Sequence, residues 1–266
     1  YVYLGSRDAR RGAQARNAIL KKHPGFADRI SNVVIDVANQ RSVKSAAKHI
    51  RESLSAKCSQ LYGIVNNAGI AHSDDGVAGV IEVNTRGPKR VLDEFATLFS
   101  VDGGRVINVS SASGPNYLYR CDQQIKRLLT DDNISWDDIS ALLDTFSNQY
   151  QIAPREDREQ ILGDVYGFSK ACTNALTMVM AKKHPHLKIN ACTPGYIETD
   201  MTAPFAARQG KTPIELGMKN PRDGARSSVF LLTAENPGSG FYYGSDCMRS
   251  PLDRYRSPGD PPYLGE

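Results

Sequence analysis

A phenol and an ammonium group stand four residues apart at Tyr166 and Lys170. In a helix this spacing places both side chains on one face, one turn apart. A tyrosine can donate a proton to a forming alcohol, but its ordinary pKa of about 10 suits that task only if it is perturbed. A neighbouring lysine cation would favour the phenolate and lower that pKa. Because the Tyr-x-x-x-Lys spacing is common in helices, it indicates acid chemistry only together with other groups.

Three more polar clusters follow short apolar runs of the chain. They are Asn66-Asn67-Ala68-Gly69, the stretch from Asn108 to Gly114, and the stretch from Pro194 to Met201. Each by itself is also compatible with an ordinary turn or cap. The second cluster contains two adjacent hydroxyls, Ser110 and Ser111, which would lie on opposite faces of a strand because successive residues alternate.

The elements that must position these clusters alternate along the chain. Apolar runs predict strands at 1–5, 32–36, 61–66, 104–110, 187–193 and 241–247. Amphipathic stretches predict helices near 9–22, 40–56, 78–99, 165–184 and 221–234. This order predicts an α/β fold with a doubly wound parallel sheet of the Rossmann type. Such sheets bind ligands at the carboxyl ends of their strands, where the polar clusters are expected to meet.

Two stretches depart from the alternation. Residues 113–164 are too long for an ordinary strand-to-helix loop. Within them, Ser135 and Asp138 have capping-box spacing, and apolar residues recur at helical intervals from Trp136 to Tyr150. We therefore predict one domain over residues 1–248 with a helical insert at 113–164. The proline-rich residues 249–266 are predicted to form a C-terminal tail without regular structure.

Composition narrows the class of protein. Lys and Arg number 33 against 29 Asp and Glu, a formal net charge of +4 spread along the chain, which argues against nucleic acid or a membrane surface as partner. No apolar run approaches the roughly 18 residues of a membrane span. The five cysteines form no C-x-x-C pair, which predicts reduced thiols in a cytoplasmic protein and no metal framework.

Taken in order, the motifs resemble those of short-chain dehydrogenases/reductases, and more narrowly those of the NADPH-dependent carbonyl reductases. The matching residues are Ser6-Arg7-Asp8, Asp36-Val37, Asn66 to Gly69, Asn84, Ser110-Ser111, Tyr166 to Lys170 and Pro194 to Met201. The resemblance runs across essentially the whole chain. The gap of 55 residues between Ser111 and Tyr166 favours the carbonyl reductase subgroup, whose members are similar in carrying a helical insert there.

The resemblance implies four catalytic residues. Tyr166 would be the general acid, Lys170 would tune it, Ser111 would hold the carbonyl oxygen, and Asn84 would hold a water of a proton relay. The sequence supports the last role, because Pro88 has no N–H and leaves the Asn84 carbonyl without its helical partner. A plain helix kink at Pro88 is the alternative.

The resemblance also implies an NADPH site. Its residues would be Arg7, Asp8, Arg11, Asp36, Val37, Asn67, Ala68, Gly69, Tyr166, Lys170, Pro194, Gly195, Ile197 and Thr199. After the first strand an NAD-specific enzyme presents a carboxylate to the ribose, whereas here Arg7 follows and suits a 2′-phosphate, with Arg10 or Arg11 adding charge. The alternative is that Arg7 is only a solvated residue at the start of a helix.

The activity implied is NADPH-dependent reduction of small-molecule ketones, aldehydes or quinones to alcohols. The alternatives are a dehydrogenase of a specific steroid, retinoid or terpenoid alcohol, and a catalytically silent dinucleotide-binding fragment. The insert is expected to cover the helices through which superfamily members commonly associate, which predicts a monomer. The apolar stripe of the insert is alternatively a dimer interface.

The first residues of the sequence predict that a segment of the family's fold is missing before them. Tyr1-Val2-Tyr3-Leu4 resembles the family's second strand, so the first strand, the glycine-rich turn and the helix that binds the pyrophosphate are expected to be missing. In the strand order 3-2-1-4-5-6 the missing strand would be central, and its loss would leave two strand edges unpaired. We therefore expect an N-terminally truncated fragment or incomplete gene model, inactive as written because it neither folds cooperatively nor binds NADPH.

Overall fold

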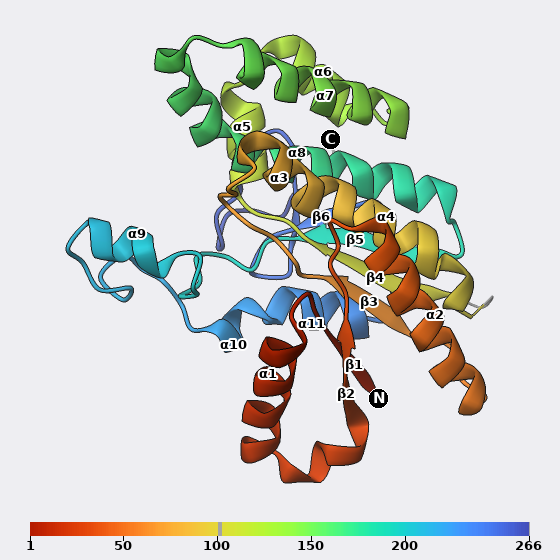
Figure 1. Cartoon of the computed structure of the whole chain (residues 1–266). Helices are drawn as coiled ribbons and strands as arrows, with labels where there is room; N and C mark the ends of the chain where they lie inside the picture. Colours follow the sequence, from red (N-terminus) through yellow and green to blue (C-terminus); the bar gives the residue numbers. More distant parts are fainter. Residues whose placement is uncertain (101–102, 266) are drawn as a thin grey trace. The chain divides into compact units, whose positions relative to one another are not determined.

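The computed structural model describes residues 1–100 and 103–265 and shows an α/β chain with a mainly parallel arrangement of strands (Figure 1). The chain divides into two compact units. Unit 1 comprises Tyr1–Leu61 and Lys89–Phe99, and unit 2 comprises Tyr62–Pro88 and Ser100–Glu266. The predicted single domain over residues 1–248 stays a prediction. Residues 101 and 102 of that range, and residue 266 of the predicted tail, lie outside the described residues.

Unit 1 is built on two parallel strands. These are β1 (Val2–Ser6) and β2 (Ile30–Val34), with Val2 opposite Ile30 and Ser6 opposite Val34. Helix α1 (Ala9–Lys22) connects them, followed by a 3-10 helix at Pro24–Arg29, and helix α2 (Gln40–Ala56) comes after β2. This confirms the predicted strand, helix, strand and helix order, with the second strand two residues earlier than expected.

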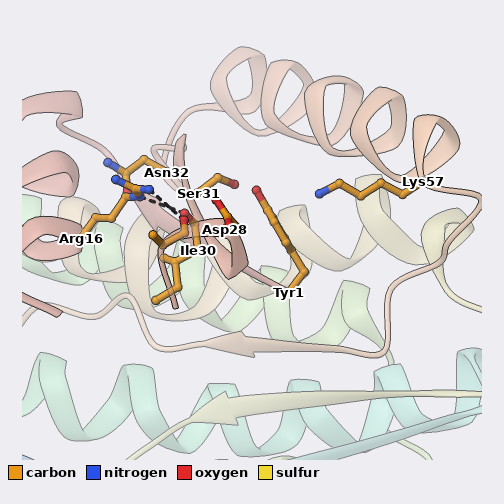
Figure 2. Close-up of a pocket in the computed structure, with 8 residues that line it drawn as sticks. Tyr1, Arg16, Asp28, Ile30, Ser31, Asn32 and Lys57 are labelled. Atoms are coloured by element: carbon orange, nitrogen blue, oxygen red, sulfur yellow. Dashed lines mark hydrogen bonds between the residues drawn. The ribbon is translucent and has the colours of Figure 1, made fainter. Parts of the chain in front are cut away.

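A surface hollow of unit 1 lies along β2. Figure 2 shows Arg16 of α1 reaching across to this strand, where its Nε donates to the Ile30 carbonyl (2.9 Å) and its Nη2 to the Ala27 carbonyl (3.1 Å). At another part of the hollow the Lys57 ammonium lies 3.3 Å from the centre of the Tyr1 ring. The Arg16 hydrogen bonds fasten α1 to the first residue of β2 and to the 3-10 helix before it. None of the predicted site residues lines this hollow.

Unit 2 contains the larger sheet, in the order β3-β4-β5-β6-β7. Strands β3 (Gly63–Asn66), β4 (Gly104–Val109), β5 (Leu187–Cys192) and β6 (Tyr242–Tyr243) are parallel, and β7 (Arg249–Ser250) pairs antiparallel with β6. The prediction that the tail lacks regular structure is therefore wrong at its first two residues. After β6 the chain turns, with Gly244 N donating to the Met248 carbonyl (2.8 Å), and pairs with the open edge of that strand.

The predicted continuous helix near 78–99 is interrupted. It consists of α3 (Gly76–Ile81), a π-helical turn at Glu82–Arg86, α4 (Gly87–Phe95) and a 3-10 turn at Ala96–Leu98. Pro88 explains the break, because it has no N–H to donate to the carbonyl four residues earlier. The widened turn contains Asn84, the residue for which the sequence predicts a released carbonyl.

The insert is more helical than predicted. It forms α5 (Ser113–Arg120), α6 (Gln123–Thr130) and α7 (Trp136–Ile152), and α8 (Arg155–Lys183) begins inside its predicted range. The capping box of α7 at Ser135 and Asp138 is confirmed. Helix α8 starts ten residues before the predicted 165, because Pro154 precedes it and Glu156 and Asp157 stabilise its first turn.

Three short helices complete unit 2: α9 (Ala203–Arg208), α10 (Pro221–Gly224) and α11 (Arg226–Thr233). Helix α8 is the most deeply buried helix of this unit, with Val165 and most residues from Gly167 to Met180 inaccessible to solvent. All five cysteines are free thiols. Across residues 1–100 and 103–265, no helix has the length and apolar character needed to cross a membrane.

Candidate active site

Two glycines allow helices α5 and α8 to approach closely. A Cβ on Gly167 of α8 would lie 3.0 Å from the Ser113 carbonyl oxygen, and a Cβ on Gly114 of α5 would lie 3.1 Å from the Ala171 nitrogen. Any larger side chain at either position would push the helices apart. Because α5 begins two residues after Ser111, this contact brings the end of β4 against the helix that carries Tyr166.

Tyr166 and Ser111 form a hydrogen-bonded pair. The phenol is largely buried, and this burial raises its pKa, while the side-chain hydrogen bond with Ser111 acts in the opposite direction. The net direction is opposite to the lowering that the sequence predicts from Lys170, because the loss of water around the phenolate outweighs the favourable contacts. A raised pKa keeps Tyr166 protonated at neutral pH, the state required of a proton donor.

Lys170 is buried beneath Tyr166. Its Nζ lies 5.7 Å from the centre of the Tyr166 ring and donates to the Val109 carbonyl (2.8 Å) at the end of β4. Burial lowers the pKa of this amine to about 8, because the cation is separated from water. Gly69 lies against the same group, since a Cβ there would be 3.3 Å from the Lys170 Nζ. The cluster from Asn66 to Gly69 thus meets the helical pair, as predicted.

The Asn84 side chain is buried, and both its oxygen and its nitrogen form hydrogen bonds. Its Oδ1 accepts from Ile70 N (2.9 Å), and its Nδ2 donates to the Ile70 carbonyl (2.9 Å) and to Ser169 Oγ (2.9 Å). The π-helical turn agrees with the predicted loss of its helical partner, but the Asn84 carbonyl is not left without a donor. Thr173 Oγ1 donates to it at 2.8 Å. A carbonyl oxygen has a second lone pair, so room for one more donor remains.

Several residues around the site form contacts for which the sequence predicts no role. They are Ser110, whose hydroxyl donates to the Lys170 carbonyl (3.2 Å), Ser113, whose N–H donates to Ser111 Oγ (3.1 Å), and Ser169 and Thr173, which bind Asn84. The sequence does contain a pattern that could have indicated Ser169 and Thr173. Ser169 and Thr173 follow Tyr166 at intervals of three and seven residues, which places both on the same helix face.

The loop after β5 carries the last predicted cluster. Gly195 adopts a left-handed φ of +89°, and its N–H donates to Thr193 Oγ1 (3.2 Å). Ile197 is buried, whereas Thr199 is exposed and its N–H donates to Thr202 Oγ1 (2.9 Å). Since β3, β4 and β5 are parallel neighbours, Asn67, Ala68, Gly69, Tyr166, Lys170, Pro194, Gly195, Ile197 and Thr199 lie at or beside one edge of this sheet.

The remaining predicted cofactor residues belong to unit 1, at the carboxyl ends of β1 and β2. Asp8 caps α1 by accepting from Arg11 N (2.7 Å). Asp36 Oδ1 accepts from Ala38 N (3.1 Å), and the Val37 carbonyl accepts from Arg90 Nη1 (2.5 Å). The structure brings these residues together with Arg7 within unit 1.

The donors of unit 1 fit a phosphorylated dinucleotide better than a metal. The exposed guanidinium groups of Arg7, Arg10 and Arg11 surround the start of α1, and none of them forms an ion pair with the described residues. Such planar donors grip phosphate oxygens in pairs. Among residues 1–100 and 103–265, no group of three or more His, Cys, Asp or Glu side chains is arranged to hold a metal ion.

Comparison with known proteins finds similarity to dehydrogenases and reductases. The family model described as short chain dehydrogenase matches residues 2–121, and (+)-neomenthol dehydrogenase of Arabidopsis thaliana is 29% identical over 251 residues, covering 83% of this chain and 81% of that protein. Carbonyl reductase (NADPH) 3 of Rattus norvegicus is 28% identical over 233 residues, covering 83% of this chain and 79% of that protein. The chain is therefore similar to short-chain dehydrogenases/reductases over residues 2–121 by the family model, and over most of its length by these relatives. These similarities support an oxidoreductase that acts on CH–OH or carbonyl groups.

Solved structures of short-chain dehydrogenases share the fold. Salutaridine reductase from Papaver somniferum has a TM-score of 0.72 at 22% identity, over 90% of this chain and 89% of that one. NADPH-bound carbonyl reductase from chicken fatty liver has a TM-score of 0.61 at 21% identity, over 94% and 87%. The family model ends before Tyr166, so helix α8 is matched only through the longer relatives. The family and its relatives indicate a nicotinamide dinucleotide as cofactor.

Proposed function

We propose that this protein uses NADPH to reduce ketones, aldehydes or quinones to alcohols. The observation that carries the proposal is the Tyr166 phenol hydrogen-bonded to Ser111, with the Lys170 amine buried one helical turn away. The names of the relatives, carbonyl reductase and neomenthol dehydrogenase, support the same reaction class.

A nicotinamide cofactor, when bound, supplies the hydride for the carbonyl carbon. The chain's own residues act on the carbonyl oxygen. The Ser111 hydroxyl is held by the Ser113 N–H (3.1 Å) and can donate to that oxygen. The Tyr166 phenol, kept protonated by its raised pKa, then delivers the proton that completes the alcohol.

Lys170 and Asn84 would return a proton to Tyr166. The Lys170 amine is fixed by the Val109 carbonyl, and its pKa of about 8 lets it exchange a proton near neutral pH. Asn84 lies near it, because a Cβ on Gly69 would lie 3.3 Å from the Lys170 Nζ and 3.4 Å from Asn84 Oδ1. We assign Asn84 to the relay through its carbonyl, whose second lone pair is available for a water beside the Thr173 hydroxyl.

The preference for NADPH over NADH rests on the start of α1. Arg7, Arg10 and Arg11 place positive charge there, and Asp8 is used as the helix cap. A 2′-phosphate would offset this charge, whereas the ribose hydroxyls of NADH would not.

A terpenoid alcohol is the second candidate substrate. The segment after β5 exposes apolar side chains close in sequence to Gly195, at Tyr196, Met201 and Phe205, each about two fifths exposed (39%, 41% and 43%). Such surface suits a bulky apolar ring ketone better than a small polar carbonyl. The relative named (+)-neomenthol dehydrogenase agrees with this choice.

The proposal is tested with the natural gene product that carries this sequence. NADPH consumption is followed with a diketone, a quinone, an aromatic aldehyde and a cyclic terpenoid ketone, and each is repeated with NADH. We expect consumption with at least one carbonyl class and a kcat/KM at least tenfold higher with NADPH than with NADH. No consumption with any of the four would overturn the reductase assignment, and equal kcat/KM values would overturn the NADPH preference.

A further inference from the structure

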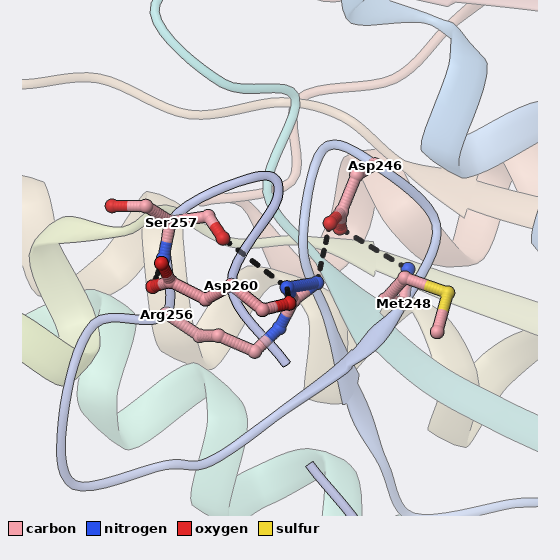
Figure 3. Close-up of polar contacts among 5 residues, drawn as sticks. All are labelled: Asp246, Met248, Arg256, Ser257 and Asp260. Carbon is pink, nitrogen blue, oxygen red and sulfur yellow. Dashed lines mark hydrogen bonds and ion pairs between the residues drawn. The ribbon is translucent and has the colours of Figure 1, made fainter. Parts of the chain in front are cut away.

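An ion pair of unit 2 lies outside the catalytic group, in the C-terminal segment. Figure 3 shows the Arg256 guanidinium directed at Asp246, with Nη2 donating to Asp246 Oδ2 at 2.5 Å. The arginine side chain is only 6% exposed and that of the aspartate 21%. This degree of burial separates the pair from the exposed ion pairs of the chain, which contribute little to structure.

Arg256 also organises the tail that carries it. Its Nη1 donates to the carbonyls of Ser257 (3.2 Å) and Asp260 (3.1 Å), and Asp260 Oδ2 accepts from Ser257 N (2.7 Å) (Figure 3). One planar guanidinium therefore joins the turn at 256–260 to a carboxylate ten residues earlier. A lysine carries its three donors on one nitrogen and cannot reproduce the planar fork in which Nη1 and Nη2 of Arg256 reach separate acceptors.

Asp246 in turn shapes the loop between β6 and β7. Its Oδ1 accepts from Met248 N (3.2 Å), and the loop is closed by Gly244 N donating to the Met248 carbonyl (2.8 Å). Gly244 leaves the space that the carboxylate occupies, because a Cβ there would lie 2.6 Å from Asp246 Oδ1. The loop from Gly244 to Met248 therefore leaves room for the Asp246 carboxylate, which in turn binds the backbone of this loop.

This loop contacts the predicted cofactor loop after β5. A Cβ on Gly195 would lie 3.1 Å from Ser245 Cβ, so the two chain segments touch at this point. The two loops leave neighbouring parallel strands, and Thr193 N donates to the Tyr243 carbonyl (3.0 Å) just before them. Residues 193–195 therefore lie against the loop that Asp246 holds.

We propose that Arg256, through its ion pair with Asp246, is a positioning residue that holds the Gly195 loop in the conformation that binds the nicotinamide cofactor. The inference rests on the proposed function, in which Pro194, Gly195, Ile197 and Thr199 contact NADPH. The C-terminal segment thereby contributes to cofactor affinity without touching the reacting atoms.

Removing one member of the pair has a defined consequence. In Arg256→Gln the Asp246 carboxylate stays in a largely buried place without a counter-charge, so the loop must rearrange to reach water. The double variant Asp246→Asn/Arg256→Gln removes both charges and retains groups able to hydrogen bond. The double variant leaves no unpaired buried charge, so we expect the loop to keep the conformation that it has in the parent protein.

The experiment measures KM for NADPH, kcat and Tm for Arg256→Gln, Arg256→Lys, Asp246→Asn and the double variant of the natural gene product. Arg254→Gln is the matched control, since Arg254 is exposed and has no hydrogen bond or ion pair with the described residues. We expect KM for NADPH to rise about tenfold in Arg256→Gln and about threefold in Arg256→Lys, with kcat within twofold at saturation. The double variant should return KM to within threefold of the parent, and the control should not change it.

The possible outcomes separate this inference from the proposed function. If Arg256→Gln does not fold, the inference is tested with two other variants. These are Arg256→Lys, which keeps the positive charge, and the neutral double variant. A lowered Tm with unchanged KM for NADPH in every folded variant would overturn the inference, because the pair would then only stabilise the fold. Absence of NADPH-dependent reduction in the parent protein would instead overturn the proposed function.

Discussion

At Lys170 the fold keeps an amine in a place from which water is excluded. Its folded-state pKa of about 8 lies below the ordinary 10.5, so the folded chain binds this proton more weakly than the unfolded chain does. The free energy of unfolding is therefore reduced by on the order of 3 kcal/mol below pH 8, and this loss is relieved as the pH rises from 8 to 10.5. The hydrogen bond to the Val109 carbonyl offsets part of it.

Lys170→Met should consequently abolish reduction while leaving the fold as stable as the parent at pH 7, or more stable by up to about 2 kcal/mol. The variant has no buried ammonium, so the free-energy cost of burying that charge disappears. The Val109 carbonyl, however, loses its hydrogen-bond donor. At pH 10.5 only that second effect remains, so the variant should become the less stable of the two. Urea unfolding without NADPH at both pH values measures this, with exposed Lys188→Met as the control. A variant destabilised more at pH 7 than at pH 10.5 would contradict the assignment of a buried cation.

Single residues also show what the sequence can and cannot predict. The types and spacing of Tyr166, Lys170 and Ser111 predict a meeting that the structure contains, because helix periodicity and strand ends are local properties. The donor to the Asn84 carbonyl was not predictable, since Thr173 reaches it from a helix 89 residues away in sequence. The raised pKa of Tyr166 was likewise not predictable, because it depends on burial that spacing alone does not reveal.

At the scale of elements, the separation of α5 and α8 sets the Ser111 to Tyr166 contact. Gly167→Ala should lower kcat at least tenfold and destabilise the fold by about 1–3 kcal/mol, because the new Cβ would meet the Ser113 carbonyl at 3.0 Å. KM for NADPH should change less than kcat, since the cofactor loops are not moved directly. Kinetic constants and urea midpoints measure both effects.

The same helix provides the control for that variant. A Cβ on Gly163 of α8 would meet no neighbouring atom within 4 Å, so Gly163→Ala should raise stability by up to about 1 kcal/mol through helix propensity alone. Its kcat should be unchanged. Equal effects of the two substitutions would show that backbone freedom, and not the close approach of α5, governs this helix.

Element boundaries were predicted where local signals mark them. The capping box at Ser135 and Asp138 predicts the start of α7 correctly. The break at Glu82–Arg86 was predicted only as a released carbonyl, because Pro88 indicates that a helix is disturbed and does not specify how. Strand β7 was missed since its pairing depends on the edge of β6 and not on its own two residues.

At the scale of the whole molecule, helix α7 covers α8 within unit 2. Ile139, Leu143 and Phe146 are buried, and the Phe146 ring stacks on that of Phe168 with centres 4.0 Å apart. Because the chain itself occupies this face of α8, we predict a monomer. Light scattering at micromolar concentration should give the mass of one chain, and a mass of two chains would support the alternative of a dimer through the insert.

The two sheets predict how the 266-residue chain unfolds. Among residues 1–100 and 103–265, β1 and β2 form a sheet of unit 1, and β3 to β7 form a separate sheet of unit 2. We expect a broad calorimetric transition whose measured enthalpy exceeds the van't Hoff value, as in chains without two-state behaviour. A single sharp transition with equal enthalpies would contradict this expectation.

In the proposed reaction the Tyr166 phenol supplies the proton that completes the alcohol. The most direct test of this step is the kcat of Tyr166→Phe in the natural gene product, with exposed Tyr119→Phe on α5 as the control. The substitution removes one oxygen and keeps the ring, so NADPH should still bind with an affinity within a few-fold of the parent. We predict a loss of kcat of about 10²–10⁴-fold in Tyr166→Phe and none in the control. A Tyr166→Phe protein that reduces carbonyl compounds at the parent rate would contradict the account.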